Sequence, residues 1–366
     1  MNQKGGVGKT TTVVNLSAAL ARRGLKILIV DCDPQANAST HLGIDIHAGN
    51  PTLYDVLTQG KSMAECIVPV SENLDIVPSE LDLAGAEVEL VATIGRETLL
   101  REALARLHRD GAEYDIVFLD CPPSLGLLPS NALAAATEVI IVLQAEFFAL
   151  QGISQLSKFI DLVVDRINPG LEVSTVITCM YDSRTRFSRE VIDDISEHFS
   201  EQMLGTFIRR NVKLAEASSH GVSVFDYDSS CPGARDYSAL ADEFLARHPE
   251  FSSRAVAVPR KPRRRSSRKA RAGGGTPEGR TGSPGRTLPQ STVNEPEPET
   301  EVAVRVEEQL VAAAVVVTPA GDAIAADAGA AAQVTPGANS STRAEMSPRT
   351  VTRGLVLSTE DELLGL

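Results

Sequence analysis

The sequence predicts an α/β protein built on a doubly wound, mostly parallel sheet. Short β-branched runs alternate with segments of helical periodicity through the first 250 residues. A glycine-rich loop directly precedes the first helical segment, and acidic residues end two of the apolar runs. Polar residues at the carboxyl ends of parallel strands are typical of the sheet edge at which such folds bind ligands.

The expected strands are short and rich in Val, Ile and Leu, as strands buried on both faces are. They cover residues 26–31, 74–78, 115–120, 138–143, 173–178 and 205–208. Between them, the spacing of apolar residues predicts helices over 10–23, 97–109, 152–167 and 189–199. This order indicates one domain with helices on both faces of its sheet.

The composition changes near residue 250. Residues 1–250 hold 35 acidic and 20 basic residues, so a contact with nucleic acid would need a local basic patch on an acidic body. Residues 254–271 carry nine basic residues and no acidic one. The residues beyond 271 include few aromatic side chains and show no sustained periodicity of apolar residues. They can therefore bury too little apolar surface to offset the entropy lost on ordering. We therefore expect a domain over 1–250 and a disordered tail over 251–366.

The cysteines and the apolar runs bear on location. The five cysteines are odd in number and form no CxxC pair, which indicates a reducing compartment and no structural zinc. The start of the chain has no signal-peptide pattern. The longest apolar run of the tail, residues 310–317, falls short of the roughly 20 residues that span a bilayer. We expect a soluble cytoplasmic protein.

The strongest local pattern is the loop that opens the chain. Its glycines let backbone N–H groups turn toward phosphate oxygens, and the following helix adds the positive end of its dipole. Lys9 is placed to reach the β- and γ-phosphates, and the Thr10 hydroxyl to bind Mg²⁺. The predicted phosphate-binding residues are Lys4, Gly5, Gly6, Val7, Gly8, Lys9, Thr10 and Thr11. The loop is a variant, since Gln3 stands where the strict pattern has glycine and Lys4 is an additional lysine.

Carboxylates end two of the predicted strands. The first strand ends in Asp31-Cys32-Asp33, and the third ends in Asp120-Cys121. Such carboxylates hold Mg²⁺ and its waters, and they orient an attacking water. One acidic strand end alone would more often be a helix cap or a turn. Two of them together with the phosphate loop predict a site that hydrolyses a nucleotide.

Six segments, in order, resemble the successive motifs of the ParA/Soj partition ATPases, P-loop NTPases of the deviant Walker A group that also includes MinD. The segments are KGGVGKTTT, DCDPQANAST, LAGAEVE, DCPPSLGLLPSNAL, MYDSRTRFS and RRNVKLAEASSHG. The resemblance covers residues 2 to about 247 and does not cover the tail. It implies slow hydrolysis of ATP with Mg²⁺, an ATP-dependent homodimer and stimulation by a ParB-type partner.

The resemblance also assigns roles within the nucleotide site. It makes Lys4 the signature lysine, which crosses the dimer interface to the partner's phosphates. Asp33 would position the hydrolytic water, Asp31 would support the magnesium shell, and Asp120 would be the Walker B carboxylate. The catalytic residues implied are Lys4, Lys9, Asp33 and Asp120; the metal-binding residues are Thr10, Asp31 and Asp33. Met180 and Asn211 lie in segments that resemble those flanking adenine.

For DNA, the resemblance implies binding without sequence preference through scattered basic surface residues. The candidates in two matching segments are Arg184, Arg186, Arg189, Arg209, Arg210 and Lys213. A solvated surface charge is the alternative for each one, and a solvated linker is the alternative for the basic segment 254–271. The implied protein acts in the cytoplasm on the nucleoid and segregates a chromosome or a plasmid.

The sequence departs from the family pattern in two places. Family members carry an apolar strand before the phosphate loop, in the middle of the sheet, but only three residues precede Lys4. A missing central strand would leave backbone groups of two neighbours unpaired, at about 1–3 kcal/mol for each buried group. We therefore expect the natural product to begin upstream of Met1. Arg209 stands where the family usually has proline.

Three related classes fit less well. A MinD-like ATPase that cycles on membranes, the main alternative, would need a basic amphipathic helix at the C-terminus, whereas residues 354–366 are acidic. A nitrogenase-reductase type would need cysteines that bridge a cluster between subunits. A tyrosine kinase on the same scaffold would want tyrosines at its end, yet all five lie before residue 250. A non-enzymatic interaction protein is disfavoured by the intact Lys9, Thr10, Asp33 and Asp120.

Overall fold

The computed structural model describes residues 7–145, 149–181, 186–252, 254–255 and 312–317. One seven-stranded sheet runs through it. In spatial order its strands are β2 (Val68–Ser71), β3 (Leu74–Val77), β1 (Ile27–Asp31), β4 (Ile116–Asp120), β7 (Ala312–Val317), β5 (Glu138–Gln144) and β6 (Glu172–Cys179). β1 pairs in parallel with β3 and β4, and β5 pairs in parallel with β6. The mostly parallel sheet predicted from the sequence is confirmed.

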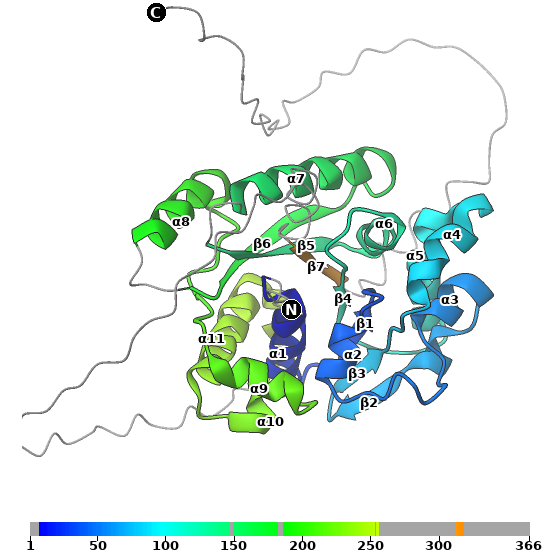
Figure 1. Cartoon of the computed structure of the whole chain (residues 1–366), viewed down its shortest axis with the longest axis horizontal. Helices are drawn as coiled ribbons and strands as arrows, with labels where there is room; N and C mark the ends of the chain where they lie inside the picture. Colours follow the sequence, from blue (N-terminus) through cyan, green and yellow to red (C-terminus); the bar gives the residue numbers. More distant parts are fainter. Residues whose placement is uncertain (1–6, 146–148, 182–185, 253, 256–311, 318–366) are drawn as a thin grey trace, which may run out of the picture.

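Helices cover both faces of the sheet (Figure 1). One face carries α3 (Leu53–Gln59), α4 (Leu83–Glu89), α5 (Leu99–Arg109), α6 (Leu127–Ala135), α7 (Ala149–Arg166) and α8 (Arg186–Phe199). The other carries α1 (Lys9–Ala21), α2 (Asn37–His41), α9 (Val212–Ser219), α10 (Val224–Asp228), α11 (Pro232–Arg247) and α12 (Pro249–Ser252). Alternate residues of β1 enter the two cores: Leu28 and Val30 face one, Ile27 and Ile29 the other. This is the doubly wound arrangement expected from the alternating pattern.

The segment 205–208, predicted as a strand, is not one. It runs along the outer edge of β6, where the Leu204 amide donates to the Val176 carbonyl at 3.0 Å and the Ile208 amide to the Thr178 carbonyl at 2.9 Å. The isolated bridges fall on either side of this segment, at Met203 and Arg209, and no ladder forms over 205–208. The apolar residues of this segment lie beside the sheet, but the segment itself is a connection that leads from the edge of β6 to α9.

A strand from the C-terminal region holds the middle of the sheet. β7 lies between β4 and β5 and is antiparallel to both, with Val315 opposite Leu119 on one side and Val139 on the other. The backbone of β7 therefore supplies hydrogen-bond partners to the facing edges of β4 and β5. This is the central position at which we expected a strand from before the phosphate loop. The structure differs from the predicted disordered tail at these six residues, because pairing on two edges provides hydrogen bonds that composition alone does not consider. The rest of the chain beyond Ala255 lies outside the described residues.

Proline in β7 tests this pairing. Val315→Pro removes an amide donor from a strand with neighbours on both sides, and should lower the free energy of unfolding by about 1–3 kcal/mol. Urea unfolding of the full chain measures the change, with Ala331→Pro, elsewhere in the same region, as the control. Equal stability of the two variants would contradict the placement of β7.

A buried histidine joins the end of α11 to the sheet. His248 is 6% exposed, and its ring stacks on Phe244 with 4.1 Å between ring centroids. Its Nδ1 lies 2.8 Å from the Phe244 carbonyl oxygen and its Nε2 lies 2.9 Å from a carboxylate oxygen of Glu138, at the start of β5. Burial opposes the charge, but the bonds to Glu138 and Phe244 prevail and raise the pKa of His248. Both ring nitrogens have acceptors, which favours the imidazolium form.

This contact should make stability depend on pH. Because the pKa of His248 is raised on folding from its ordinary 6.5, its contribution is complete below about pH 6.5 and is lost as the pH rises through the folded pKa. His248→Gln should cost roughly 1–3 kcal/mol at pH 6 and less at pH 8. Thermal unfolding from pH 6 to 8 measures this, with His248→Gln/Glu138→Gln as the paired control. An unchanged pH slope in the single variant would show that the ion pair is not formed.

Candidate nucleotide-binding site

The phosphate loop enters α1 through a left-handed glycine. Gly8, at φ 97°, is the N-cap of α1, and its carbonyl accepts the first helical bond from the Thr12 amide at 2.8 Å. This φ is one that side chains other than glycine adopt with strain. Lys9 and Thr10 follow as the first two residues of the helix, where unpaired amides and the helix dipole favour an anion. Lys4, Gly5 and Gly6 lie outside the described residues.

Two carboxylates lie side by side at the carboxyl ends of neighbouring strands. β1 and β4 are parallel and in register, so Asp31 is directly paired with Asp120. Both residues are fully buried. Burial raises the pKa of each carboxyl, and the charge of Asp120 adds to the increase at Asp31, whereas Lys9 and Thr10 partly offset it at Asp120. The register of two predicted strands therefore brings these residues together next to the start of α1.

The two carboxylates have different surroundings. Asp31 accepts from the Ser39 amide at 2.9 Å, the Ser39 hydroxyl at 2.8 Å and the Asp33 amide at 3.2 Å. It therefore fixes the loop from β1 to α2. Burial raises the pKa of Asp120, and the Lys9 charge and the Thr10 hydroxyl offset this only in part. Neither of its buried carboxylate oxygens has a hydrogen bond of good geometry among the described residues. Such a group implies a ligand, because an unpaired buried carboxylate is costly.

Magnesium fits the donors present. Among the residues described, no group of three or more His, Cys, Asp and Glu side chains could hold an ion by itself. Mg²⁺ usually takes one or two carboxylates and completes its shell with waters and phosphate oxygens. Asp120 and the neighbouring Thr10 hydroxyl offer the oxygen donors for this arrangement. When bound, the ion would neutralise phosphate charge.

Asp33 is held in a tight turn after β1. It is 5% exposed, and its Oδ1 accepts from the Gln35 amide at 2.9 Å. The turn closes through Ala36, a non-glycine residue at φ 51°, whose amide donates to the Asp33 carbonyl at 2.8 Å. The Asp33 carboxylate is thus fixed two residues beyond Asp31, at the same edge of the sheet.

The segments containing Met180 and Asn211 are brought together. The amide of Tyr181 donates to the Ile208 carbonyl at 3.0 Å, and the Tyr181 ring stacks on Phe207 at 4.6 Å. Met180, at φ 53°, turns the chain at the end of β6. Asn211 caps α9 by accepting from the Lys213 amide at 3.0 Å, while its side-chain Nδ2 is buried without a partner among the described residues.

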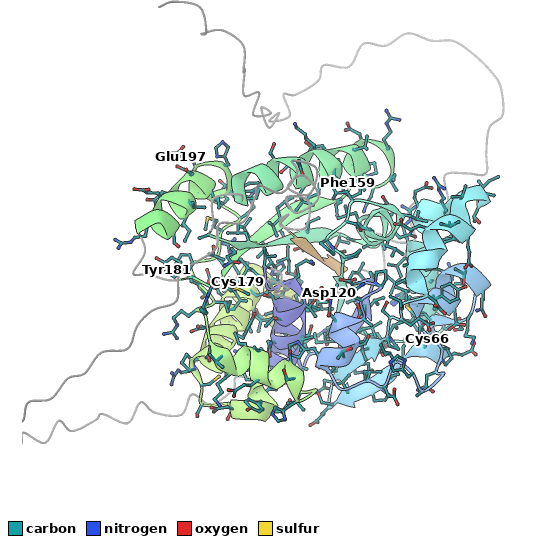
Figure 2. All side chains as sticks on the ribbon, viewed as in Figure 1. Cys66, Asp120, Phe159, Cys179, Tyr181 and Glu197 are labelled. Carbon is teal, nitrogen blue, oxygen red and sulfur yellow. The ribbon has the colours of Figure 1, made fainter. Side chains whose placement is uncertain are left out.

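Three residues that link these parts were not found from the sequence. The Thr12 hydroxyl lies 3.1 Å from the hydroxyl of Tyr237 and 3.4 Å from the thiol sulfur of Cys179. In Figure 2, Asp120 and Cys179 come from β4 and β6 on either side of the start of α1. Tyr237 is on α11 and 1% exposed. Its sequence signal, a single tyrosine on an apolar helix face, does not distinguish it from other core residues.

Comparison with known proteins decides the family. Residues 1–173 match a family model described as "AAA domain". The chromosome-partitioning ATPase Soj of Treponema pallidum is 45% identical over 249 residues, which cover 68% of this chain and 96% of Soj. The chromosome partitioning protein ParA of Caulobacter vibrioides is 43% identical over 256 residues, covering 70% and 96%. The chain belongs to the ParA/Soj family of chromosome-partitioning ATPases.

Solved structures place this ParA/Soj family chain among nucleotide-binding proteins. A structure titled cobyrinic acid a,c-diamide synthase from Mycobacterium smegmatis, with bound ADP and magnesium, has a TM-score of 0.58 and 35% identity, and the match covers 71% of this chain and 97% of that one. The cell division ATPase MinD of Pyrococcus furiosus has a TM-score of 0.53 and 27% identity, covering 66% and 95%. No helix in the described part of this chain is long and apolar enough to cross a membrane. Residues 354–366, which distinguish the MinD-like alternative, lie outside that part.

The predicted DNA-binding residues of this ParA/Soj chain fall in two places. Arg189 is exposed on α8, and Arg210 is exposed just before α9. Lys213 pairs with Glu216 at 2.6 Å, and Arg209 pairs with Asp236 at 2.6 Å. Arg184 and the side chain of Arg186 lie outside the described residues.

The two buried carboxylates should respond oppositely to neutralisation. Asp120→Asn removes an unpaired buried charge, so the ligand-free protein should gain about 1–3 kcal/mol, and the stabilisation by ATP with Mg²⁺ should be lost. Asp31→Asn is the matched control, and should instead destabilise the ligand-free protein because it weakens the bonds to Ser39. Thermal unfolding with and without Mg²⁺ and ATP measures both. A less stable Asp120→Asn protein that still responds to Mg²⁺ and ATP would refute the assignment.

Proposed function

We propose that this chain is an ATP-driven switch that dimerises on ATP, binds DNA without sequence preference and segregates chromosome or plasmid cargo. The observation that carries the proposal is the buried, unpaired carboxylate of Asp120 beside the start of α1 in a member of the ParA/Soj family. The carboxylate and the helix terminus together offer a place for a metal ion and for a triphosphate.

The chain hydrolyses ATP with Mg²⁺ through residues fixed in place before the ligand arrives. The amides at the start of α1 and the Lys9 ammonium bind the phosphates, and Asp120 with Thr10 holds the metal shell. Asp33 orients the attacking water, and Asp31 keeps the turn that carries Asp33 in position through Ser39. Because no strong general base is among these residues, turnover is slow until a ParB-type partner stimulates it.

An apolar surface beside the site supports a dimer. Among the described residues, Leu81, Val88, Val91 and Ile94 are large apolar side chains with 64–99% exposure on and around α4. Glu87 on α4 accepts from the Leu127 amide at 2.9 Å, which ties this helix to the segment that follows Asp120. This contact places the exposed surface on the face of the sheet that also carries α6, the helix that follows Asp120. A second copy covers it, and Lys4 of each copy reaches the other's phosphates.

DNA binding is local on an acidic chain. The net charge is −13, so phosphate contacts depend on the basic residues of two segments, one around α8 and one just before α9, rather than on the overall field. Arg189 and Arg210 are exposed and available for this role, with Arg184, Arg186 and Lys213 in the same two segments. Contacts of this kind are sensitive to salt and indifferent to sequence, which suits movement over the nucleoid in the cytoplasm.

Replacement of Lys4 separates dimerisation from nucleotide binding. Lys4→Ala should raise the dimer Kd measured with ATP by on the order of a hundredfold, because each dimer loses two charge-assisted contacts. Binding of ADP to the monomer should change little. Sedimentation velocity with ATP and with ADP measures the dimer, and calorimetry measures the binding.

Asp33→Ala provides the opposite control. It should keep the ATP dimer, and its binding to nonspecific DNA, long after the wild type has hydrolysed its nucleotide, because the attacking water is no longer oriented. ATP-dependent dimers of Lys4→Ala would contradict the role across the interface. Absence of any Mg²⁺-dependent ATP binding by the wild type would overturn the function as a whole.

A further inference from the structure

Arg209 is held by α11, although 55% of its side chain is exposed to solvent. Its Nη2 donates to one Asp236 carboxylate oxygen at 2.6 Å, and its Nε donates to the other at 3.0 Å. Its backbone amide also donates to Asp236, at 3.2 Å. A planar fork on a carboxylate fixes both distance and orientation, and the amide contact fixes the main chain as well. Asp236 is only 9% exposed, so the pair is shielded from solvent on one side.

The loop fixed by this pair carries Asn211. The segment from Phe207 to Arg209 lies against the end of β6, with a parallel bridge between Tyr181 and Arg209. Two residues later Asn211 starts α9, with its Nδ2 donor buried and unpaired. Gly233 of α11 approaches this side chain so closely that a Cβ there would lie 3.2 Å from Asn211 Nδ2 and 2.9 Å from Leu214. α11 therefore sets the position of the loop at two points.

The residue after Asp236 reaches the phosphate loop. Tyr237 is buried, and its hydroxyl lies 3.1 Å from the Thr12 hydroxyl in the first turn of α1. Thr12 also lies 3.4 Å from the sulfur of Cys179, just before Met180. Consecutive residues of one helix thus hold the loop of Asn211 and the helix that binds the phosphates. A helix is stiff enough to keep the spacing between these two points constant.

We propose that Arg209 and Asp236 form a positioning pair that sets the base-side loop relative to the phosphate loop, and that Arg209 is not a DNA contact. The inference rests on the proposed function and on the family resemblance, which implies that Asn211 lies on the adenine side of the nucleotide. The pair acts on recognition of the base and leaves the phosphate contacts of Lys9 and Thr10 unchanged. It also gives a reason for an arginine at this position, since proline has neither the amide nor the side chain that Asp236 accepts from.

Two ligands that differ in the base test the proposal. Calorimetry with Mg²⁺ on the full chain compares ADP with inorganic tripolyphosphate, which has phosphates and no base. Arg209→Ala and Asp236→Asn should each weaken ADP binding on the order of tenfold, as loss of a charge-assisted bond at a positioning group would. The double variant should be no weaker than either single one, and tripolyphosphate binding should stay as in the wild type. Arg235→Ala, at an exposed arginine of α11 next to Asp236, is the matched control and should leave ADP binding unchanged.

The other outcomes are distinguishable. Equal weakening of both ligands would show general loosening of the site and would overturn the proposal, as would unchanged ADP binding in Arg209→Ala. Loss of DNA binding with unchanged ADP binding in that variant would make Arg209 a DNA contact instead. If Asp236→Asn fails to fold, Arg209→Lys, which keeps the charge without the fork, should still weaken ADP more than tripolyphosphate. Failure of the wild type to bind either ligand would refute the proposed function itself.

Discussion

The structure depends on a negative charge buried at the end of β4 with nothing in the described chain to neutralise it fully. Asp120 gains from Lys9, Thr10 and the positive end of α1, yet burial still raises its pKa. A bound Mg²⁺ would offset this buried charge, and the phosphates of the nucleotide would complete the shell of the metal. Stability and ligand binding are therefore linked: the state with Mg²⁺ and nucleotide is favoured by relief at Asp120 as well as by new contacts.

Asp31, an aspartate at the same edge of the sheet as Asp120, has a structural role instead. Asp31 is paired in register with Asp120, but the Ser39 hydroxyl and amide reach it from α2, and Ser39 in turn accepts from the Ser79 amide. Asp31 therefore joins β1, α2 and the segment after β3, and it keeps the turn that carries Asp33 in place. Asp31 thus stabilises the loops around the site, whereas Asp120 is available to a ligand. The two carboxylates differ because Ser39 donates two hydrogen bonds to Asp31 and none to Asp120.

The sequence predicted the parts that depend on local pattern. Continuous apolar runs form most of β1, β4 and β5, and the acidic ends of β1 and β4 fall at one edge because parallel strands share a direction. The pattern of strand ends did not distinguish Asp31 from Asp120, and only the family resemblance implied different roles for them. The structure adds the hydrogen bonds from Ser39 that separate the two residues. Nor did it find β7, whose place is set by two open strand edges far away in the chain, or the contact between Thr12 and Tyr237, which joins residues 225 positions apart. Long-range polar contacts leave no periodic signal.

α11 connects these distant parts. Its first half carries Asp236 and Tyr237, which reach the loop of Asn211 and the first turn of α1, and its carboxyl end leads to His248, whose ring is bonded to Glu138 of β5. Because the helix is held at both ends, a shift of the base-side loop would have to break the ion pair between Arg209 and Asp236 or move α1 itself. The side chains proposed to set the base-side loop thus come from a helix that was not among those predicted from the sequence. The phosphate loop provides the chemistry, and the packing of α11 against it sets the geometry in which that chemistry acts on a complete nucleotide.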